Sequence, residues 1–214
     1  KTNRIENPLG FALDHLSCSW IVEDASDPVQ TAAQFILAKD PEFEQVFFDS
    51  GREEGLRIDS LAYRPDICLA PRTRYYWKVR VWSETDYAES AAAWFETAKM
   101  DEPWQAQWIT PDWEDKAIHP ILSKSFTLPA SALNARVYIC GLGLYHLELN
   151  GDKVGNEHLT PYCNAYDQWL QYQTFDITGQ LTGGENRLAV MLGNGWYKGR
   201  DCGDGGRHSN LYGD

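Results

Sequence analysis

His146 and Glu148 are a pair of residues whose types and spacing could carry out chemistry. They lie two positions apart in the run Leu-Tyr-His-Leu-Glu-Leu (144–149), so a β-strand would point both side chains to one face. An imidazole beside a carboxylate is the arrangement of an acid–base dyad. Such a pair on a strand face is more often solvated or satisfied within the core than catalytic, and the sequence favours these two structural interpretations.

The glycine-rich end of the chain holds a second set of candidates. Asp201, Asp204 and His208 could ligate a metal ion, but no predicted element holds them in place, which favours a loop. Gly203 and the pair Gly205-Gly206 are spaced as in a phosphate-binding loop. No predicted strand precedes them and no helix follows, so the phosphate-loop interpretation fails.

The elements that must position these residues are β-strands. Alternating apolar residues between turn signals predict strands in the second half of the chain at 123–128, 135–140, 144–149, 170–177 and 187–192. Asn150-Gly151 is a strong hairpin signal, since both turn positions need positive φ. No closing strand follows Gly199. The sequence therefore predicts a fragment of a jelly-roll-like sandwich, or one whose remaining strands come from residues beyond 214.

The first half of the chain is also predicted to be all β. The expected strands are 17–22, 33–38, 75–82 and 93–97, with Asp49-Ser50-Gly51 as a turn between two strands. Apolar residues alternate strictly from Leu69 to Val81, and the order Leu, Pro, Tyr at the start of this run is typical of a tyrosine corner. This module resembles a fibronectin type III domain, with Trp20 as the buried tryptophan of an early strand. It contains no catalytic constellation and is interpreted as a structural spacer.

Charge and composition exclude several classes of function. The net charge of −12 and the lack of a basic cluster argue against binding to nucleic acid or an anionic membrane. No apolar run approaches the roughly 18 residues of a membrane-spanning helix. The five cysteines are scattered, which argues against a disulfide framework and a structural zinc site. The compartment stays open, with the cytoplasm as a working expectation.

The fold prediction is therefore all-β, with two consecutive β-sandwich modules. Residues 1–99 form the fibronectin type III-like module, and residues 104–214 form the incomplete jelly-roll-like module. The boundary lies at 100–103, where the strand ending in Thr97 is followed by an acidic turn and Pro103.

An ordered set of short motifs resembles the N-terminal part of bacterial α-L-rhamnosidases with an (α/α)6-barrel catalytic domain. Each motif is weak alone, but together they run in order over nearly the whole chain. They are 7–10 (Asn-Pro-Leu-Gly), 30–32, 49–51, 75–82, 94–97, 108–109, 141–145, 149–155, 172–178 and 193–200.

The resemblance implies that the whole protein removes terminal α-L-rhamnose from glycosides by inversion. Inversion uses two carboxyl groups about 6.5–9.5 Å apart. In this family both belong to the helical barrel, which would follow residue 214, so this chain is expected to be catalytically inactive. Its expected partners are a rhamnose-containing glycoside, through the parent enzyme, and the catalytic domain of the same polypeptide.

The resemblance also implies a site for calcium and sugar. In some members the second module binds rhamnose through calcium, and here Asn150, Asn194 and the carbonyl near Gly199 would be the oxygen ligands, with Trp196 or Tyr162 stacked on the ring. Sugar-binding members carry an acidic residue where this chain has Leu149, which weakens the site. The sequence therefore favours Asn150 as a hairpin residue and Asn194 as a positive-φ loop residue.

Three functional hypotheses stay open. The chain is the accessory, non-catalytic region of an α-L-rhamnosidase-like glycoside hydrolase, a calcium-dependent rhamnose-binding module, or a purely structural β-protein. An intact sugar or metal site would distinguish the rhamnose-binding module from the purely structural protein. A coding sequence that continues into a helical barrel separates the first from both.

Overall fold

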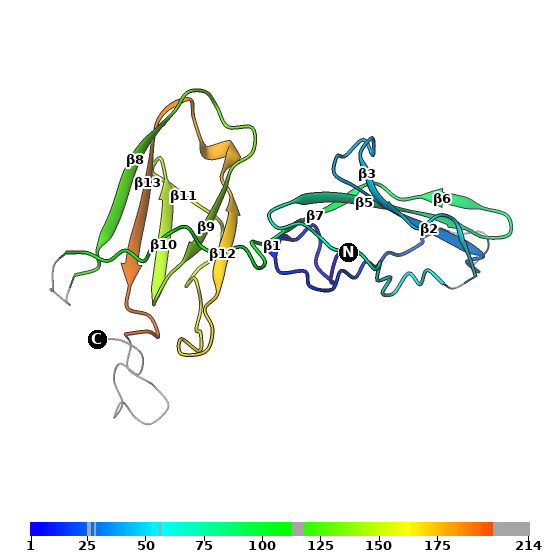
Figure 1. Cartoon of the computed structure of the whole chain (residues 1–214), viewed down its shortest axis with the longest axis horizontal. Coiled ribbons are helices and arrows are strands. Elements are labelled where there is room, and N and C mark those ends of the chain that lie inside the picture. Colours follow the sequence, from blue (N-terminus) through cyan, green and yellow to red (C-terminus); the bar gives the residue numbers. More distant parts are fainter. Residues whose placement is uncertain (25–26, 28, 56, 113–117, 199–214) are drawn as a thin grey trace. The chain divides into compact units, whose positions relative to one another are not determined.

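The computed structural model describes all residues except 25, 26, 28, 56, 113–117 and 199–214 (Figure 1). The chain divides into two compact domains, Lys1–Trp104 and Gln105–Asp214. The described residues form thirteen strands and one 3₁₀ turn, η1 (Thr178–Gln180), so the predicted all-β class is confirmed. No helix among them is long and apolar enough to cross a membrane.

A seven-stranded sheet forms one layer of the first domain. Its main order is β1-β7-β5-β2-β3, with β4 paired to β2 and β6 paired to β5. The strands are β1 (Leu9–Phe11), β2 (Ala32–Ala38), β3 (Val46–Asp49), β4 (Glu53–Glu54), β5 (Arg74–Trp82), β6 (Tyr87–Glu89) and β7 (Ala93–Thr97).

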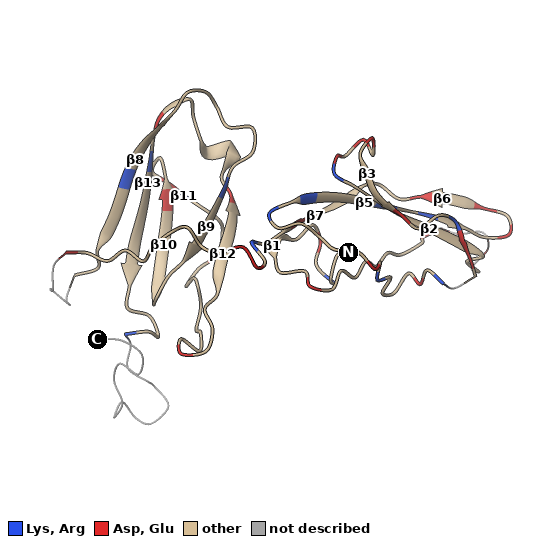
Figure 2. Cartoon of the chain, viewed as in Figure 1, with Lys and Arg blue, Asp and Glu red and all other residues tan. Residues whose placement is uncertain are grey.

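Strand β5 shows how the sequence pattern builds this sheet. Its residues alternate strictly between buried and half-buried, because successive side chains of a strand point to opposite faces. The buried set packs into the core, whereas Arg74, Lys78 and Arg80 lie on the other face and pair with Glu96 or Glu89. Figure 2 marks the basic positions on β5 in blue and the acidic positions on β6 in red.

The second layer of the first domain consists of extended segments instead of a regular sheet. Leu13, Leu16 and Cys18 pack on the sheet together with Tyr63 and residues near it. The strand predicted at 17–22 is wrong, since within it only Cys18 forms β-bridges, one with Thr2 and one with Tyr63. Its neighbours bond elsewhere: Ser19 N–H donates to the Lys1 carbonyl and Trp20 N–H to the Ser60 carbonyl, so no ladder forms. Trp20 is half-buried against the core but lies outside any strand.

The predicted tyrosine corner is confirmed at Tyr75. Its hydroxyl oxygen accepts a hydrogen bond of 3.0 Å from the backbone N–H of Ala70, and its ring is fully buried. The turn at 49–51 is also confirmed, because it joins β3 to β4 and Gly51 N–H donates to Asp49 Oδ1.

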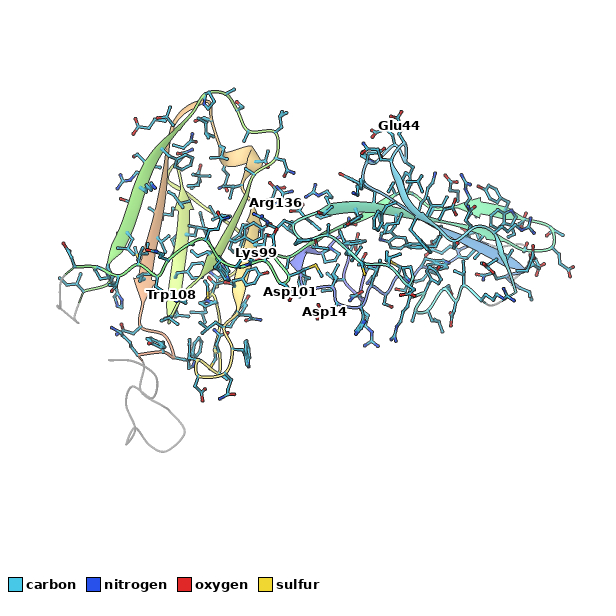
Figure 3. The ribbon with its side chains drawn as sticks, viewed as in Figure 1. Asp14, Glu44, Lys99, Asp101, Trp108 and Arg136 are labelled. Carbon is cyan, nitrogen blue, oxygen red and sulfur yellow. The ribbon has the colours of Figure 1, made fainter. Side chains whose placement is uncertain are left out.

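The second domain has two sheets. A four-stranded sheet has the order β11-β10-β13-β8, and a two-stranded sheet pairs β12 with β9. The strands are β8 (Ile121–Leu128), β9 (Arg136–Cys140), β10 (Leu144–Leu149), β11 (Asp152–Lys153), β12 (Tyr172–Asp176) and β13 (Gly184–Gly193). All five strands predicted for this half are confirmed, with small differences at their ends. Residues 102–110 belong to no strand and carry the exposed Trp108 (Figure 3).

The core of the second domain lies between these two sheets. Tyr145, Leu147 and Leu149 of β10 point inward and meet Phe175 of β12, while apolar residues of β9 and β13 pack around them. The opposite side chains of β10, at positions 144, 146 and 148, therefore lie on the outer face of the four-stranded sheet.

Candidate functional site

Asn150 occupies the turn between β10 and β11, where both its side-chain oxygen and its side-chain nitrogen form hydrogen bonds. Asn150 and Gly151 have φ values of 57° and 93°, and the flanking Leu149 and Asp152 are paired, which confirms the predicted hairpin. Asn150 Oδ1 accepts from Arg187 N–H at 2.8 Å. Its Nδ2 donates to the Gln180 carbonyl and to Asn186 Oδ1.

Asn194 and Trp196 directly follow β13. The Asn194 carbonyl accepts a hydrogen bond from Lys198 N–H, closing a turn. The positive φ predicted for Asn194 falls instead on Gly195, at 50°. Gly143 lies against this turn, since a Cβ atom there would be 2.4 Å from the Gly193 carbonyl oxygen and 2.6 Å from that of Asn194.

The loop that carries Tyr162 lies at the same end of the second domain. Tyr145 N–H donates to the Thr160 carbonyl, and the rings of Tyr166 and Tyr197 meet edge to face with centroids 5.2 Å apart. Large aromatic side chains are exposed in these two loops: Tyr162 by 45%, Trp169 by 53% and Trp196 by 47%. We call Tyr162, Trp169, Asn194 and Trp196 the loop end. Burial raises the pKa of the Tyr166 hydroxyl beside it.

The structure does not bring Asn150 and Asn194 together. Asn150 lies opposite Arg187, whereas Asn194 follows Gly193, which lies opposite Leu144 at the other end of β10. The seven steps along the strand from residue 187 to residue 194 span about 23 Å at roughly 3.3 Å per residue. Two ligands of one calcium ion lie within about 5 Å of each other, since each Ca–O distance is about 2.3–2.6 Å.

The described residues therefore do not bring together the two asparagines of the calcium site that the family resemblance implies. The antiparallel register of β10 and β13 places Asn150 and Asn194 at opposite ends of β10, and Oδ1 of Asn150 already accepts a hydrogen bond from Arg187 N–H. Where the chain is described, no group of three or more His, Cys, Asp or Glu side chains could hold a metal ion. Gly199, Asp201, Asp204 and His208 lie outside the described residues.

His146 and Glu148 form the pair expected from their spacing. His146 Nε2 lies 3.2 Å from Glu148 Oε1, and both side chains are about two-fifths exposed. This solvated pair on the outer face of β10 confirms the prediction made from the sequence.

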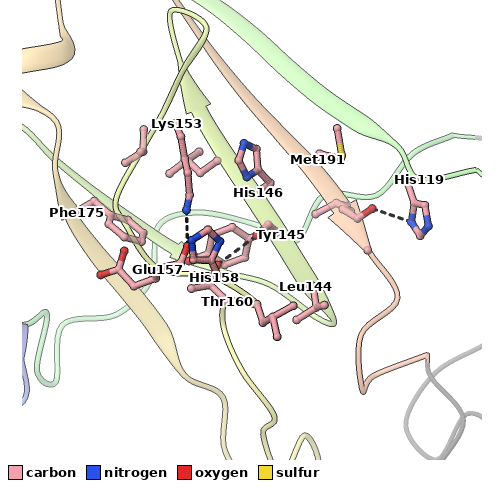
Figure 4. Close-up of a pocket in the computed structure, with 15 residues that line it drawn as sticks. His119, Leu144, Tyr145, His146, Lys153, Glu157, His158, Thr160, Phe175 and Met191 are labelled. Carbon is pink, nitrogen blue, oxygen red and sulfur yellow. Dashed lines mark hydrogen bonds between the residues drawn. The ribbon is translucent and has the colours of Figure 1, made fainter.

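A groove with a volume of about 330 Å³ lies beside this pair (Figure 4). Leu144, His146, Met191 and Gly193 come from β10 and β13, and His119 lies on one side. Residues 153–160 line the other side, where Lys153 Nζ donates to the Glu157 carbonyl at 2.6 Å. Sequence analysis identified only His146, because His119 and His158 belong to no motif and reach it only through the fold.

Tyr145 connects the groove to the core. Its ring lies beneath the groove and its hydroxyl lies 2.5 Å from Gln173 Oε1 of β12. Burial is the main cause that raises the pKa of this phenol well above its usual value, so the hydroxyl stays protonated. It serves as a structural donor.

The fold defines an all-β protein of two domains, the first of immunoglobulin-like type. Residues 1–101 match the family profile "Rha78A-like, N-terminal immunoglobulin domain", and residues 130–214 match "Alpha-L-rhamnosidase N-terminal domain". The chain thus corresponds to the N-terminal region of α-L-rhamnosidases, which confirms the family resemblance.

Relatives and solved structures give the same result. An α-L-rhamnosidase of Formosa agariphila is 31% identical over 91% of this chain and 24% of its own length. One of Streptomyces avermitilis is 35% identical over 55% of this chain and 12% of its own. The solved α-L-rhamnosidase of Dictyoglumus thermophilum aligns with a TM-score of 0.80 at 31% identity, over 92% of this chain and 25% of that one.

A second solved structure, the α-L-rhamnosidase of Aspergillus terreus, aligns with a TM-score of 0.76 at 26% identity. That alignment covers 97% of this chain and 25% of the other. This chain therefore spans about a quarter of the length of the relatives that match nearly all of it.

Proposed function

We propose that this chain is the accessory, non-catalytic N-terminal portion of an α-L-rhamnosidase-like glycoside hydrolase, which removes terminal α-L-rhamnose from glycosides. The observation that carries the proposal is the ordered match of both domains to the N-terminal quarter of α-L-rhamnosidases. The remaining three quarters of those relatives leave room for a catalytic domain in the same polypeptide.

Two carboxyl groups of the first domain have pKa values that do not suit them to the role of a glycosidase acid. A glycosidase general acid needs a raised pKa so that it can hold its proton near neutral pH. Hydrogen bonds lower the pKa values of Asp40 and Glu89 instead of raising them. Backbone N–H groups, that of Glu44 first, lower the pKa of Asp40, and Lys78 and then Arg80 lower that of Glu89. Both residues serve as structural acceptors.

The experiment compares the 214-residue chain with the full coding sequence that contains it. An aryl α-L-rhamnoside is the substrate and release of the phenol is measured. We expect release by the full protein and none by the chain. Hydrolysis by the chain, or none by the full protein, would contradict the proposal.

Scaffolding of the catalytic domain is the more specific part of the proposal. Removal of residues 1–214 from the full protein is expected to lower its melting temperature and soluble yield. A shortened protein with unchanged melting temperature and kcat/KM would show that these domains do not stabilise the rest.

A second candidate function is carbohydrate binding at the loop end. Three exposed aromatic rings on two adjacent loops favour it, because aromatic faces pack well against the C–H faces of sugars. The residues that would contact the sugar are Tyr162, Asn194 and Trp196, and bound calcium would add to the affinity. Isothermal titration with L-rhamnose, first with calcium and then with EGTA, tests both claims.

The matched controls are two tryptophan variants. Trp196→Ala is expected to abolish the binding heat, whereas Trp108→Ala, which removes a ring exposed by 62% in the segment before β8, is expected to leave it unchanged. Loss of the binding heat in EGTA would show that rhamnose binding needs calcium. Equal binding heat from both variants would exclude the loop end as the binding site.

A further inference from the structure

The groove on the outer face of β10 and β13 exists because of a specific pairing in the sheet. His146 pairs with Met191 and Leu144 pairs with Gly193, so the side chains of each pair lie on the same face. Gly193 has no side chain, which leaves a gap beside Leu144. His119 closes one side of this gap, since its Nδ1 lies 3.2 Å from the Leu192 carbonyl oxygen.

The opposite side of the groove comes from the segment after β11. Val154 N–H donates to the Leu147 carbonyl, and Thr160 binds Tyr145 through both its carbonyl and its hydroxyl. These bonds hold residues 154–160 against the edge of β10. His158 is exposed on this segment and faces the groove across from His119 (Figure 4).

The polar groups in the groove are suited to hydroxyl groups. A neutral imidazole offers one donor and one acceptor, as a hydroxyl does. With Nδ1 of His119 donating to Leu192, its Nε2 is an acceptor; with Nε2 of His146 donating to Glu148, its Nδ1 is an acceptor. Where the chain is described, the structure gives the His158 ring no hydrogen-bond partner, so both of its nitrogens are available.

The charges and the apolar groups of the groove further restrict the class of ligand that it can bind. Lys153 and Glu157 line the groove with opposite charges, and Glu148 beside His146 adds another negative charge, so an anion gains no net attraction. Leu144, Leu159 and Met191 supply apolar surface. The volume of about 330 Å³ falls at the small end of the range for ligand pockets, roughly 300–1,000 Å³.

We propose that this groove is a subsite for one neutral sugar ring, separate from the loop end and independent of calcium. Its imidazoles bind the sugar hydroxyls and its apolar side chains contact the C–H face. The proposed function enters only in the choice of sugars for the test, and the readout is binding, so inactivity of the full protein would not affect it.

The experiment follows the histidine ring signals of the 214-residue chain by NMR, in EGTA, during titration with methyl α-L-rhamnoside. We expect shifts in the signals of His119, His146 and His158, and weaker ones with D-glucuronate, which is anionic. His158→Ala is expected to weaken binding about fivefold, as loss of one hydrogen bond does. His15→Ala, in the first domain, is the matched control and should change nothing.

A steric variant tests the groove directly. A Cβ atom at Gly193 would have its nearest neighbour, Leu144 Cβ, at 3.6 Å, which is an ordinary contact, and φ at Gly193 is not positive, so Gly193→Val is expected to fill the gap. The Gly193→Val variant should abolish the histidine ring shifts, while its amide spectrum remains that of a folded protein. Trp196→Ala should leave the ring shifts unchanged. The proposal would be overturned if methyl α-L-rhamnoside at high concentration caused no ring shifts, or if the shifts persisted in the Gly193→Val variant. Stronger shifts with D-glucuronate would exclude a preference for a neutral ligand.

Discussion

The side chain of Asn150 donates a hydrogen bond of 2.9 Å to Oδ1 of Asn186, a polar residue only 1% exposed. Asn186 in turn binds the backbone of Thr182 through both its oxygen and its amide nitrogen. This pair connects the β10–β11 turn to the turn before β13. The asparagine that family resemblance assigns to a ligand site is thus a structural residue in this chain.

The first prediction concerns this pair. Asn186→Ala should lower the free energy of unfolding of the second domain by about 2–3 kcal/mol, because buried partners lose their bonds. Asn150→Gly, which keeps the positive φ without strain, should cost about 1–2 kcal/mol. Urea unfolding of both single variants and the double variant gives the coupling energy. The exposed Asn156→Ala is the control, and a coupling near zero would contradict the prediction.

The second prediction compares two glycines. Gly143 and Gly151 both have φ near +90°, but a Cβ atom would clash with backbone only at Gly143. Gly151→Ala should therefore cost only the left-handed strain of about 1–2 kcal/mol. Gly143→Ala should cost clearly more and disturb the turn at Asn194. Melting temperatures of the two variants test this, and equal losses would show that the close contact at Gly143 relaxes freely.

The third prediction concerns the stability of the first domain at acidic pH, which depends on Glu89. Hydrogen bonds from Lys78, at 2.9 Å, and from Arg80 lower the pKa of Glu89 from its ordinary 4.5 to about 2. A lowered folded-state pKa means that the stabilisation is complete above 4.5 and is lost as the pH falls toward 2. Glu89→Gln should therefore lower stability near neutral pH.

The measurement for Glu89 is the urea midpoint of both proteins as a function of pH. The difference between them should be constant above pH 4.5 and shrink below it. The effect should also weaken in high salt, because the three side chains are partly exposed. A difference that grows as the pH falls would have the wrong sign.

The fourth prediction concerns the two cores, which share no residue. Leu147→Ala should destabilise the second domain by about 2–5 kcal/mol, and Phe35→Ala the first by about 3–5 kcal/mol. Hydrogen exchange measured by mass spectrometry separates peptides of the two domains. Each variant is expected to speed exchange in its own domain, and equal acceleration in both would show that they unfold as one unit.

The sequence was informative where the signal is local. Alternation of apolar residues along 74–82 and 144–149 predicted two strands and their buried faces, because a strand turns every second side chain to the same side. Asn150-Gly151 predicted its hairpin and Tyr75 its corner, since each depends on a few neighbouring residues. The predicted strand at 17–22 failed because its backbone partners lie in separate segments.

The sites depended on the tertiary structure. The antiparallel register of β10 and β13 separates Asn150 from Asn194, and the same register sets Gly193 opposite Leu144 and opens the groove. Long-range bonds bring His119 and His158 to its two sides, although they lie far apart in the chain. The sequence by itself determined the longer strands, the turns at 49–51 and 150–151 and the family, because these follow from short-range patterns. Only the folded chain decided which polar side chains meet, because that depends on hydrogen bonds between residues distant in sequence.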